Sequence, residues 1–144
     1  MAEFLLLLRT SGIKTLVDVR RFPTSGRYPH FARDALARSL RRSGIRYLHL
    51  GEELGGFRTG GFEAYMATRG FAAGLKALEF TARRSPTAIM CAERLPWRCH
   101  RRFIGAAMSL RGWDVVHVID PGHTWSPGDP TSPELPLGEI SSIE

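Results

Sequence analysis

The stretch Thr87-Ala-Ile-Met-Cys-Ala-Glu-Arg-Leu-Pro-Trp-Arg-Cys-His-Arg-Arg102 begins as an apolar segment and continues into a loop of reactive and cationic side chains. Thr87 to Cys91 has the pattern of a buried strand, and Pro96 cannot continue regular structure. Apolar residues recur at helical spacing from Arg98 to Arg111. The loop is therefore predicted to join the carboxyl end of a strand to the amino end of a helix. In open α/β sheets ligands bind at such a place, because the unpaired N–H groups and the dipole of the helix favour an anion.

Helical and strand patterns alternate on both sides of this stretch. The other predicted helices cover residues 2–9, 32–42 and 62–83, the last interrupted at Gly70, and the other predicted strands cover 13–19, 45–50 and 113–119. Residues 51–61 contain five glycines and are predicted to form a loop. This alternation predicts a three-layer α/β fold, with a mainly parallel sheet of about four strands flanked by helices.

Length and composition indicate a single globular domain. The chain has 144 residues, of which 43% are hydrophobic, enough for one core. The α/β domain is predicted to cover residues 1–120, and the Pro-, Gly- and Ser-rich residues 121–144 are predicted to be an extended or mobile tail. No internal repeat is found.

Most of the basic residues are arginines. The formal net charge is +6, and only Lys14 and Lys76 of the 20 basic residues are lysines. Arginine suits bidentate recognition of phosphate or carboxylate, although genome composition or heat tolerance would produce the same bias. The apolar run at residues 1–8 is too short to span a bilayer, and no secretion signal follows it. We therefore expect a cytoplasmic protein with no membrane contact and no structural disulfide between Cys91 and Cys99.

The carboxyl ends of parallel strands lie at the same edge of a sheet, so residues that follow different strands are expected to meet there. We predict a cleft there. Its candidate catalytic residues are Cys91, Glu93 and His100; its candidate anion-binding residues are Arg20, Arg21, Arg98 and Arg101; and its further candidate pocket residues are Asp18, His30, His49, Trp97 and Cys99.

Simpler interpretations stand beside these functional ones. Asp18 and Arg20 could form a structural ion pair, and Cys91 could be a small buried residue. If Cys91 is a nucleophile, the helix amino end and nearby arginines would lower the pKa of its thiol. Glu93 and His100 could form an acid/base pair or simply be solvated. The spacing of the cysteines and His100 matches no standard zinc pattern, so no metal is predicted.

The first turn of the helix after the loop contains an electrostatic conflict. Arg98, Arg101 and Arg102 lie where cations oppose the helix dipole, so a bound anion or an acidic partner is needed to offset them.

Several segments resemble the uncharacterised family known as domain of unknown function 488. They are Leu16-Val-Asp-Val-Arg-Arg-Phe-Pro23, Pro29-His-Phe31, Gly44-Ile-Arg-Tyr-Leu-His-Leu50 with Leu54-Gly-Gly56, and Met90-Cys-Ala-Glu93 with Pro96-Trp-Arg-Cys-His-Arg101. The resemblance spans roughly residues 1–120 and implies an α/β fold but no established reaction. Members of that family usually carry a further strand before their first helix, whereas Met1 lies almost at the predicted helix here.

The sequence leaves three classes of function open, and it does not decide between enzyme and binding protein. The first is a protein that binds or acts on a phosphate, a nucleotide or another anionic ligand at the strand ends. The second is sulfur transfer or phosphatase-like chemistry through Cys91, because the strand–cysteine–arginine order is weakly similar to rhodaneses. Against it, six residues separate Cys91 from Arg98, and Pro96 offers no N–H to an anion. The third is a non-catalytic nucleic-acid-binding module, although no RRM, KH or helix-turn-helix signature is present. Cofactor and oligomeric state do not follow from the sequence.

Overall fold

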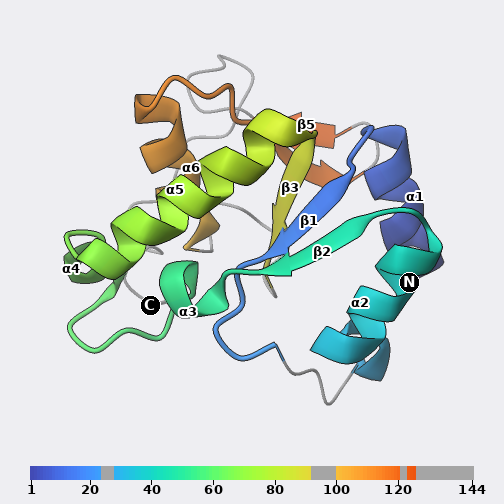
Figure 1. The fold of residues 1–144 in the computed structure, drawn as a ribbon, viewed down its shortest axis with the longest axis horizontal. Helices are drawn as coiled ribbons and strands as arrows, with labels where there is room; N and C mark the ends of the chain where they lie inside the picture. The colour runs from blue at the N-terminus through green and yellow to red at the C-terminus, as the bar shows by residue number, and fades with distance from the viewer. Residues whose placement is uncertain (24–27, 92–99, 121–122, 126–144) are drawn as a thin grey trace.

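A parallel sheet lies at the centre of the computed structural model, which describes residues 1–23, 28–91, 100–120 and 123–125. Its strands are β1 (Thr15–Asp18), β2 (Arg46–His49) and β3 (Thr87–Met90), in the order β2-β1-β3. Asp18 lies opposite His49 on one side and Met90 on the other. All three strands therefore end at the same edge of the sheet (Figure 1).

Helices cover both faces of this sheet, which confirms the three-layer α/β fold. Helices α1 (Ala2–Thr10) and α2 (Arg33–Arg42) lie toward one side, and α5 (Arg69–Arg84) and α6 (Arg101–Leu110) lie toward the other (Figure 1). The alternation of β1 explains why both faces are apolar: Leu16 packs with the residues of α1 and α2, whereas Val17 and Val19 pack with those of α5 and α6.

Two short helices lie between β2 and α5, where the sequence pattern was misleading. Helix α3 (Gly51–Leu54) occupies the start of the predicted loop, because Leu54 is buried against the small residue Gly74 of α5. Helix α4 (Phe62–Tyr65) is separated from α5 at residues 66–68, so Gly70 is inside a helix and is not the break. The hydroxyl of Thr68 instead caps α5 by accepting the N–H of Phe71 at 3.3 Å.

The prediction of a fourth strand in the sheet is wrong. Strand β4 (His117–Asp120) pairs antiparallel with β5 (His123–Trp125) in a separate two-stranded sheet, and residues 113–116 are not part of a strand. Apolar composition at residues 113–119 could not show which partner the segment would take, since strand pairing depends on tertiary contacts.

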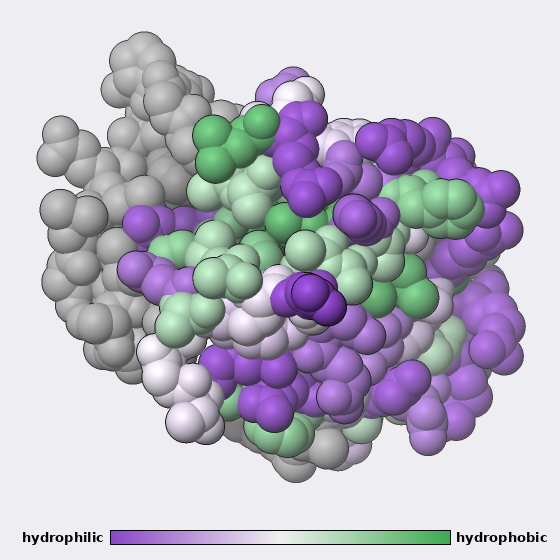
Figure 2. Space-filling view, turned by 60° about the vertical axis from the view of Figure 1, so that its left-hand side comes forward, coloured by the Kyte–Doolittle hydropathy of each residue, from purple (hydrophilic) through white to green (hydrophobic). Residues whose placement is uncertain are grey.

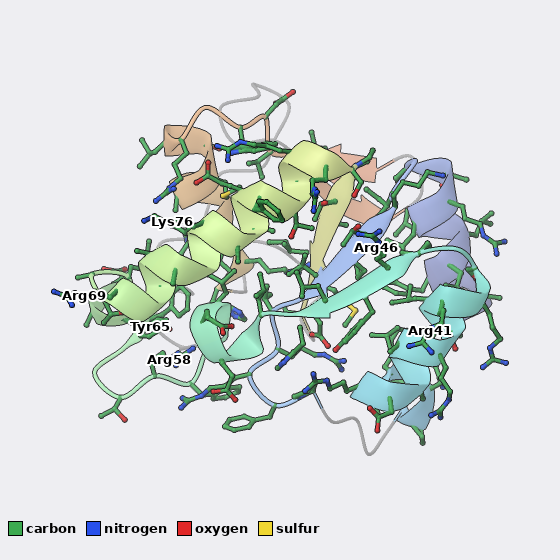
Figure 3. The ribbon with its side chains drawn as sticks, in the orientation of Figure 1. Arg41, Arg46, Arg58, Tyr65, Arg69 and Lys76 are labelled. Atoms are coloured by element: carbon green, nitrogen blue, oxygen red, sulfur yellow. The ribbon has the colours of Figure 1, made fainter. Side chains whose placement is uncertain are left out.

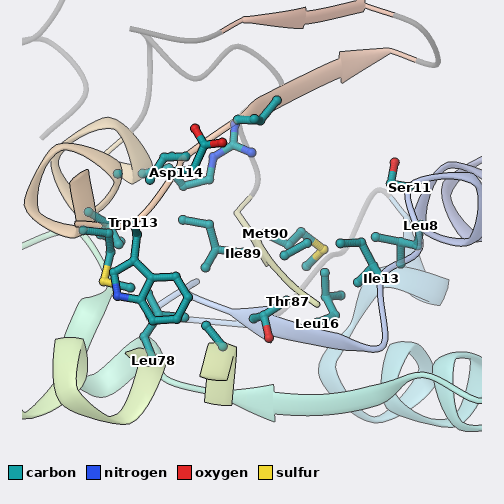
Figure 4. A pocket seen from close by; sticks show the side chains of 18 of the residues that line it. Leu8, Ser11, Ile13, Leu16, Leu78, Thr87, Ile89, Met90, Trp113 and Asp114 are labelled. Carbon is teal, nitrogen blue, oxygen red and sulfur yellow. The ribbon is translucent and has the colours of Figure 1, made fainter. Parts of the chain in front are cut away.

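A groove of about 540 Å³ runs along the side of β3 that faces away from β1. Leu8 of α1, Ile89 of β3 and Trp113 line it (Figure 4). Ile104 of α6 and residues 114–116 line it as well. Within the described residues, β3 pairs only with β1, so the groove separates the sheet from the segment that was predicted to extend it.

Glu79 of α5 binds the residues that lead into that segment. Its carboxylate accepts hydrogen bonds from the indole N–H of Trp113 at 3.3 Å and from Arg111, and it pairs with Arg83 at 3.2 Å. The indole hydrogen bond, followed by the hydrogen bond from Arg111, holds the pKa of Glu79 below its usual value of 4.5. One carboxylate thus joins α5 to the residues that follow α6.

Replacing Glu79 with glutamine should lower the Tm at neutral pH, because the amide loses its ionic partners. A carboxylate with a depressed pKa stabilises the fold above its unfolded pKa, and this contribution is lost as the pH falls through the folded pKa. The Tm difference between wild type and Glu79→Gln should therefore shrink below pH 4.5. Thermal melts followed by circular dichroism across that range would measure it. Glu63→Gln, on the exposed side of α4, is the control, and an equal pH-independent effect in both variants would contradict this role of Glu79.

Candidate functional site

A buried ionic cluster closes the end of the central strand. Asp18 has no exposed surface, and its carboxylate accepts the Nε and Nη2 groups of Arg20 at 2.9 and 2.8 Å. The Arg20 backbone N–H donates to the same carboxylate at 3.1 Å, and the Tyr47 hydroxyl donates to it at 2.6 Å. We call Asp18, Arg20 and Tyr47 the strand-end cluster. The bidentate contact matches the planar fork of the guanidinium to the carboxylate.

The ionisation of the cluster follows from burial and pairing. Burial by itself lowers the pKa of Arg20, but the hydrogen bond and charge of Asp18 outweigh it and leave that pKa raised. Burial, followed by the hydrogen bond to Asp18, raises the pKa of Tyr47 well above its usual value of 10.0. Arg20 is thus cationic and Tyr47 a neutral donor at physiological pH.

The backbone of Arg20 positions the end of the second strand. Its carbonyl oxygen lies 2.7 Å from Nε2 of His49. A Cβ atom on Gly51 would lie 2.0 Å from the same oxygen, so only glycine fits at that position. The chain after β2 therefore packs directly on the chain after β1.

The start of α6 lies against the same edge. His100 precedes the helix, and its Nε2 atom lies 3.3 Å from the carbonyl oxygen of Val19. The imidazole ring lies 5.3 Å from the ring of Phe62 and close to Gly56, where a Cβ would approach Nδ1 to 3.4 Å. Cys91 directly follows β3 and is partly buried against the core beneath α5 and α6.

The candidate anion-binding arginines have different surroundings. Arg21 is partly exposed and donates from Nη1 to the carbonyl of Phe57 at 2.5 Å. The side chain of Arg101 lines the groove beside β3. The guanidinium carbon of Arg102 lies 5.3 Å from the ring centroid of Phe103. The Nη1 atom of Arg102 is buried with no hydrogen-bond partner in the described part of the chain.

Among the described site residues, those that follow the three strands or precede α6 lie at one edge of the sheet but not on one face of it, namely Asp18, His49, Cys91 and His100. Asp18 lies on the side of α1 and α2 with Tyr47, whereas Cys91 packs on the side of α5 and α6. His30, in the 3₁₀ helix η1 (Pro29–Phe31), is exposed and contacts the rings of its sequence neighbours. Four predicted site residues lie outside the described residues, namely Glu93, Trp97, Arg98 and Cys99.

Sequence reasoning missed the role of Tyr47. Its signal is present in the second strand, where a tyrosine follows the polar Arg46 and precedes Leu48. The register then brings Tyr47 opposite Leu16, two residues before Asp18 on the same face of β1. A phenol at that position can reach a carboxylate at the strand end.

The described residues contain no group of three or more His, Cys, Asp or Glu side chains that could hold a metal ion. Nor does any described helix combine the length and apolar character needed to cross a membrane.

Breaking the strand-end cluster should destabilise the protein in a graded way. Asp18→Asn leaves the buried Arg20 charge uncompensated, which costs about 3–5 kcal/mol. Tyr47→Phe removes one hydrogen bond to a charged group and should cost about 1.5–3 kcal/mol. Urea denaturation would give both free energies of unfolding, with Asp34→Asn on the exposed side of α2 as the control. If Asp18→Asn behaves like Asp34→Asn, the cluster does not support the fold.

Comparison with protein families gives a match over most of the chain. The model of "Domain of unknown function DUF488" matches residues 1–108, which include β1, β2, β3 and most of α6. No curated protein and no solved structure is significantly similar to the chain. The match covers the strand-end cluster, Cys91 and the start of α6, and it spans most of the chain. The protein belongs to the DUF488 family.

Proposed function

We propose that the carboxyl edge of the sheet, together with the amino end of α6, binds a phosphate-bearing ligand. The observation that carries this proposal is the charge at the start of α6. Arg101 and Arg102 both lie in its first turn, and no acidic residue lies there to balance them. Cations at this end oppose the helix dipole, and a bound anion would relieve the conflict.

Two further features support an anion at this edge. The Asp18 carboxylate is paired with Arg20 and accepts a hydrogen bond from Tyr47, so its negative charge is compensated and repels a bound anion less. The buried Nη1 of Arg102 has no hydrogen-bond acceptor among the described residues, and buried N–H groups in native proteins are normally satisfied by protein, water or ligand. A phosphate oxygen would supply such an acceptor.

The net charge of the protein does not by itself locate the site. Figure 2 shows hydrophilic side chains over much of one face, with hydrophobic ones reaching the surface between them. The cations labelled in Figure 3 are spread from α2 to α5 and do not form one patch. The proposal therefore rests on the local arrangement at the strand ends and not on the overall charge of +6. Cytoplasmic location stays a prediction from the sequence.

Titration calorimetry with inorganic phosphate would test the site. Wild type should bind, and Arg102→Ala should weaken binding by about 1.5–3 kcal/mol before screening by salt. Arg98→Ala, a candidate from the sequence, should have a similar effect. Arg41→Ala is the matched control, since Arg41 is exposed in the last turn of α2 (Figure 3). Absent phosphate binding, or a loss of stability without a loss of affinity in Arg102→Ala, would contradict the proposal.

Sulfur transfer through Cys91 is the second candidate, and the position of Cys91 directly after β3 favours it. Residues 92–99, which would surround the reacting sulfur, lie outside the described residues. Thiosulfate turnover by wild type that disappears in Cys91→Ser would place this activity above simple anion binding.

A further inference from the structure

Two exposed phenylalanine rings meet beside the carboxyl edge of the sheet. Phe22 follows β1 and is 61% exposed, and Phe57 follows α3 and is 69% exposed. Their ring centroids lie 6.0 Å apart with the planes inclined at 42°. Single exposed apolar residues are ordinary on protein surfaces, but paired exposed aromatic rings beside a candidate site indicate an interaction surface.

The backbone holds Phe57 in an uncommon conformation. Its φ angle is +61°, in the left-handed region that bulky side chains rarely adopt. Such strain persists only where surrounding contacts determine the backbone, and it concentrates at functional surfaces. Here the strained backbone carries a large apolar side chain that is exposed, so no burial of this side chain offsets the strain.

Arg58, the next residue, provides the contacts that determine this backbone. Its Nε donates to the carbonyl of Gly55 at 2.8 Å, and its Nη2 donates to the carbonyl of Glu52. Its guanidinium lies 3.7 Å from the ring centroid of Tyr65, whose hydroxyl donates to the carbonyl of Glu53 at 2.7 Å (Figure 3). Arg58 therefore holds the loop that carries Phe57 through contacts with residues before the loop and with Tyr65 after it.

Arg21 adds a positive charge to the two rings. Its guanidinium carbon lies 5.5 Å from the ring centroid of Phe22, and its Nη1 donates to the carbonyl of Phe57. A Cβ on Gly55 would lie 2.6 Å from Cβ of Arg21, so the two segments touch without an intervening side chain. Of the five N–H donors of a guanidinium, the described contacts of Arg21 use one in a hydrogen bond.

We propose that Arg21, Phe22 and Phe57, here called the aromatic platform, bind the base of a nucleotide unit whose phosphate occupies the proposed anion site. This inference rests on the proposed function and specifies its ligand. Every nucleobase offers a flat π face that stacks on exposed aromatic rings, and arginine binds phosphate oxygens. The unit is either a free nucleotide or part of a single strand, since both present the same base and phosphate.

Three probes test the platform, namely inorganic phosphate, thymidine monophosphate and a fluorescein-labelled oligothymidylate. Calorimetry would measure the first two, and fluorescence anisotropy the third. The variants are Phe22→Ala and Phe57→Ala. Phe80→Ala is the matched control, because Phe80 on α5 is 59% exposed and also contacts an arginine. The guanidinium carbon of Arg84 lies 4.7 Å from the ring centroid of Phe80.

The platform predicts a pattern across these probes. Thymidine monophosphate should bind wild type at least about tenfold more tightly than phosphate, because the base stacks on the rings. Phe22→Ala and Phe57→Ala should lose this advantage and keep the affinity for phosphate, whereas Phe80→Ala should behave as wild type. A single strand as ligand would bind more tightly than the mononucleotide and with a stronger dependence on salt. Equal affinity of the two would identify a free nucleotide, and either result supports the platform.

Other results would overturn it. If wild type binds phosphate but the base adds no affinity, the platform is wrong and the anion site stands. If wild type binds no phosphate, the proposed function fails and the inference fails with it. Equal losses in Phe57→Ala and Phe80→Ala would mean that exposed rings contribute non-specifically.

Two further variants separate folding from binding at position 57. Phe57→Tyr keeps the ring and should keep the affinity. Phe57→Gly should relieve the left-handed backbone, leave the Tm unchanged or raised, and still lose the affinity for the base. A stable glycine variant with undiminished nucleotide affinity would contradict the inference.

Discussion

The buried contact between Asp18 and Arg20 is the constraint from which the arrangement of the strand ends follows. It lies at the end of the central strand, where a carboxylate with no exposed surface needs a partner. The backbone N–H of Arg20 also donates to the Asp18 carboxylate. Such a pair need not be more stable than apolar residues of the same size, but removing one partner leaves an uncompensated charge. Its contribution is to define one conformation for the turn after β1.

That turn then determines what can lie beside it. Because the carbonyl of Arg20 points toward the chain after β2, His49 binds it and Gly51 cannot carry a side chain. The following loop packs against Arg21 at Gly55, and the anchored Arg58 leaves Phe57 exposed beside Phe22. A buried ionic contact and an exposed aromatic pair are thus connected by a few residues of tightly packed backbone. In closely packed regions the position of one group restricts the positions of its neighbours, because they have little room to shift.

The other end of the candidate site depends on α6. His100 contacts the carbonyl of Val19, which joins the start of that helix to the same turn after β1. Arg102 lies in the first turn, where the helix dipole disfavours its charge. The ionic cluster and the start of α6 therefore both contact the short segment that follows β1.

The sequence by itself determined the alternation of elements, the parallel sheet and the gathering of Asp18, His49, Cys91 and His100 at one edge. These follow from local periodicity and from the polarity of parallel strands, which need no knowledge of side-chain contacts. Only the tertiary structure decided that Tyr47 completes the cluster and that Phe22 meets Phe57. It also decided that residues 117–120 pair with 123–125 and leave a groove beside β3. The physical reason is that strand pairing and side-chain contacts join residues far apart in the chain, and their free energy depends on packing that no local pattern encodes.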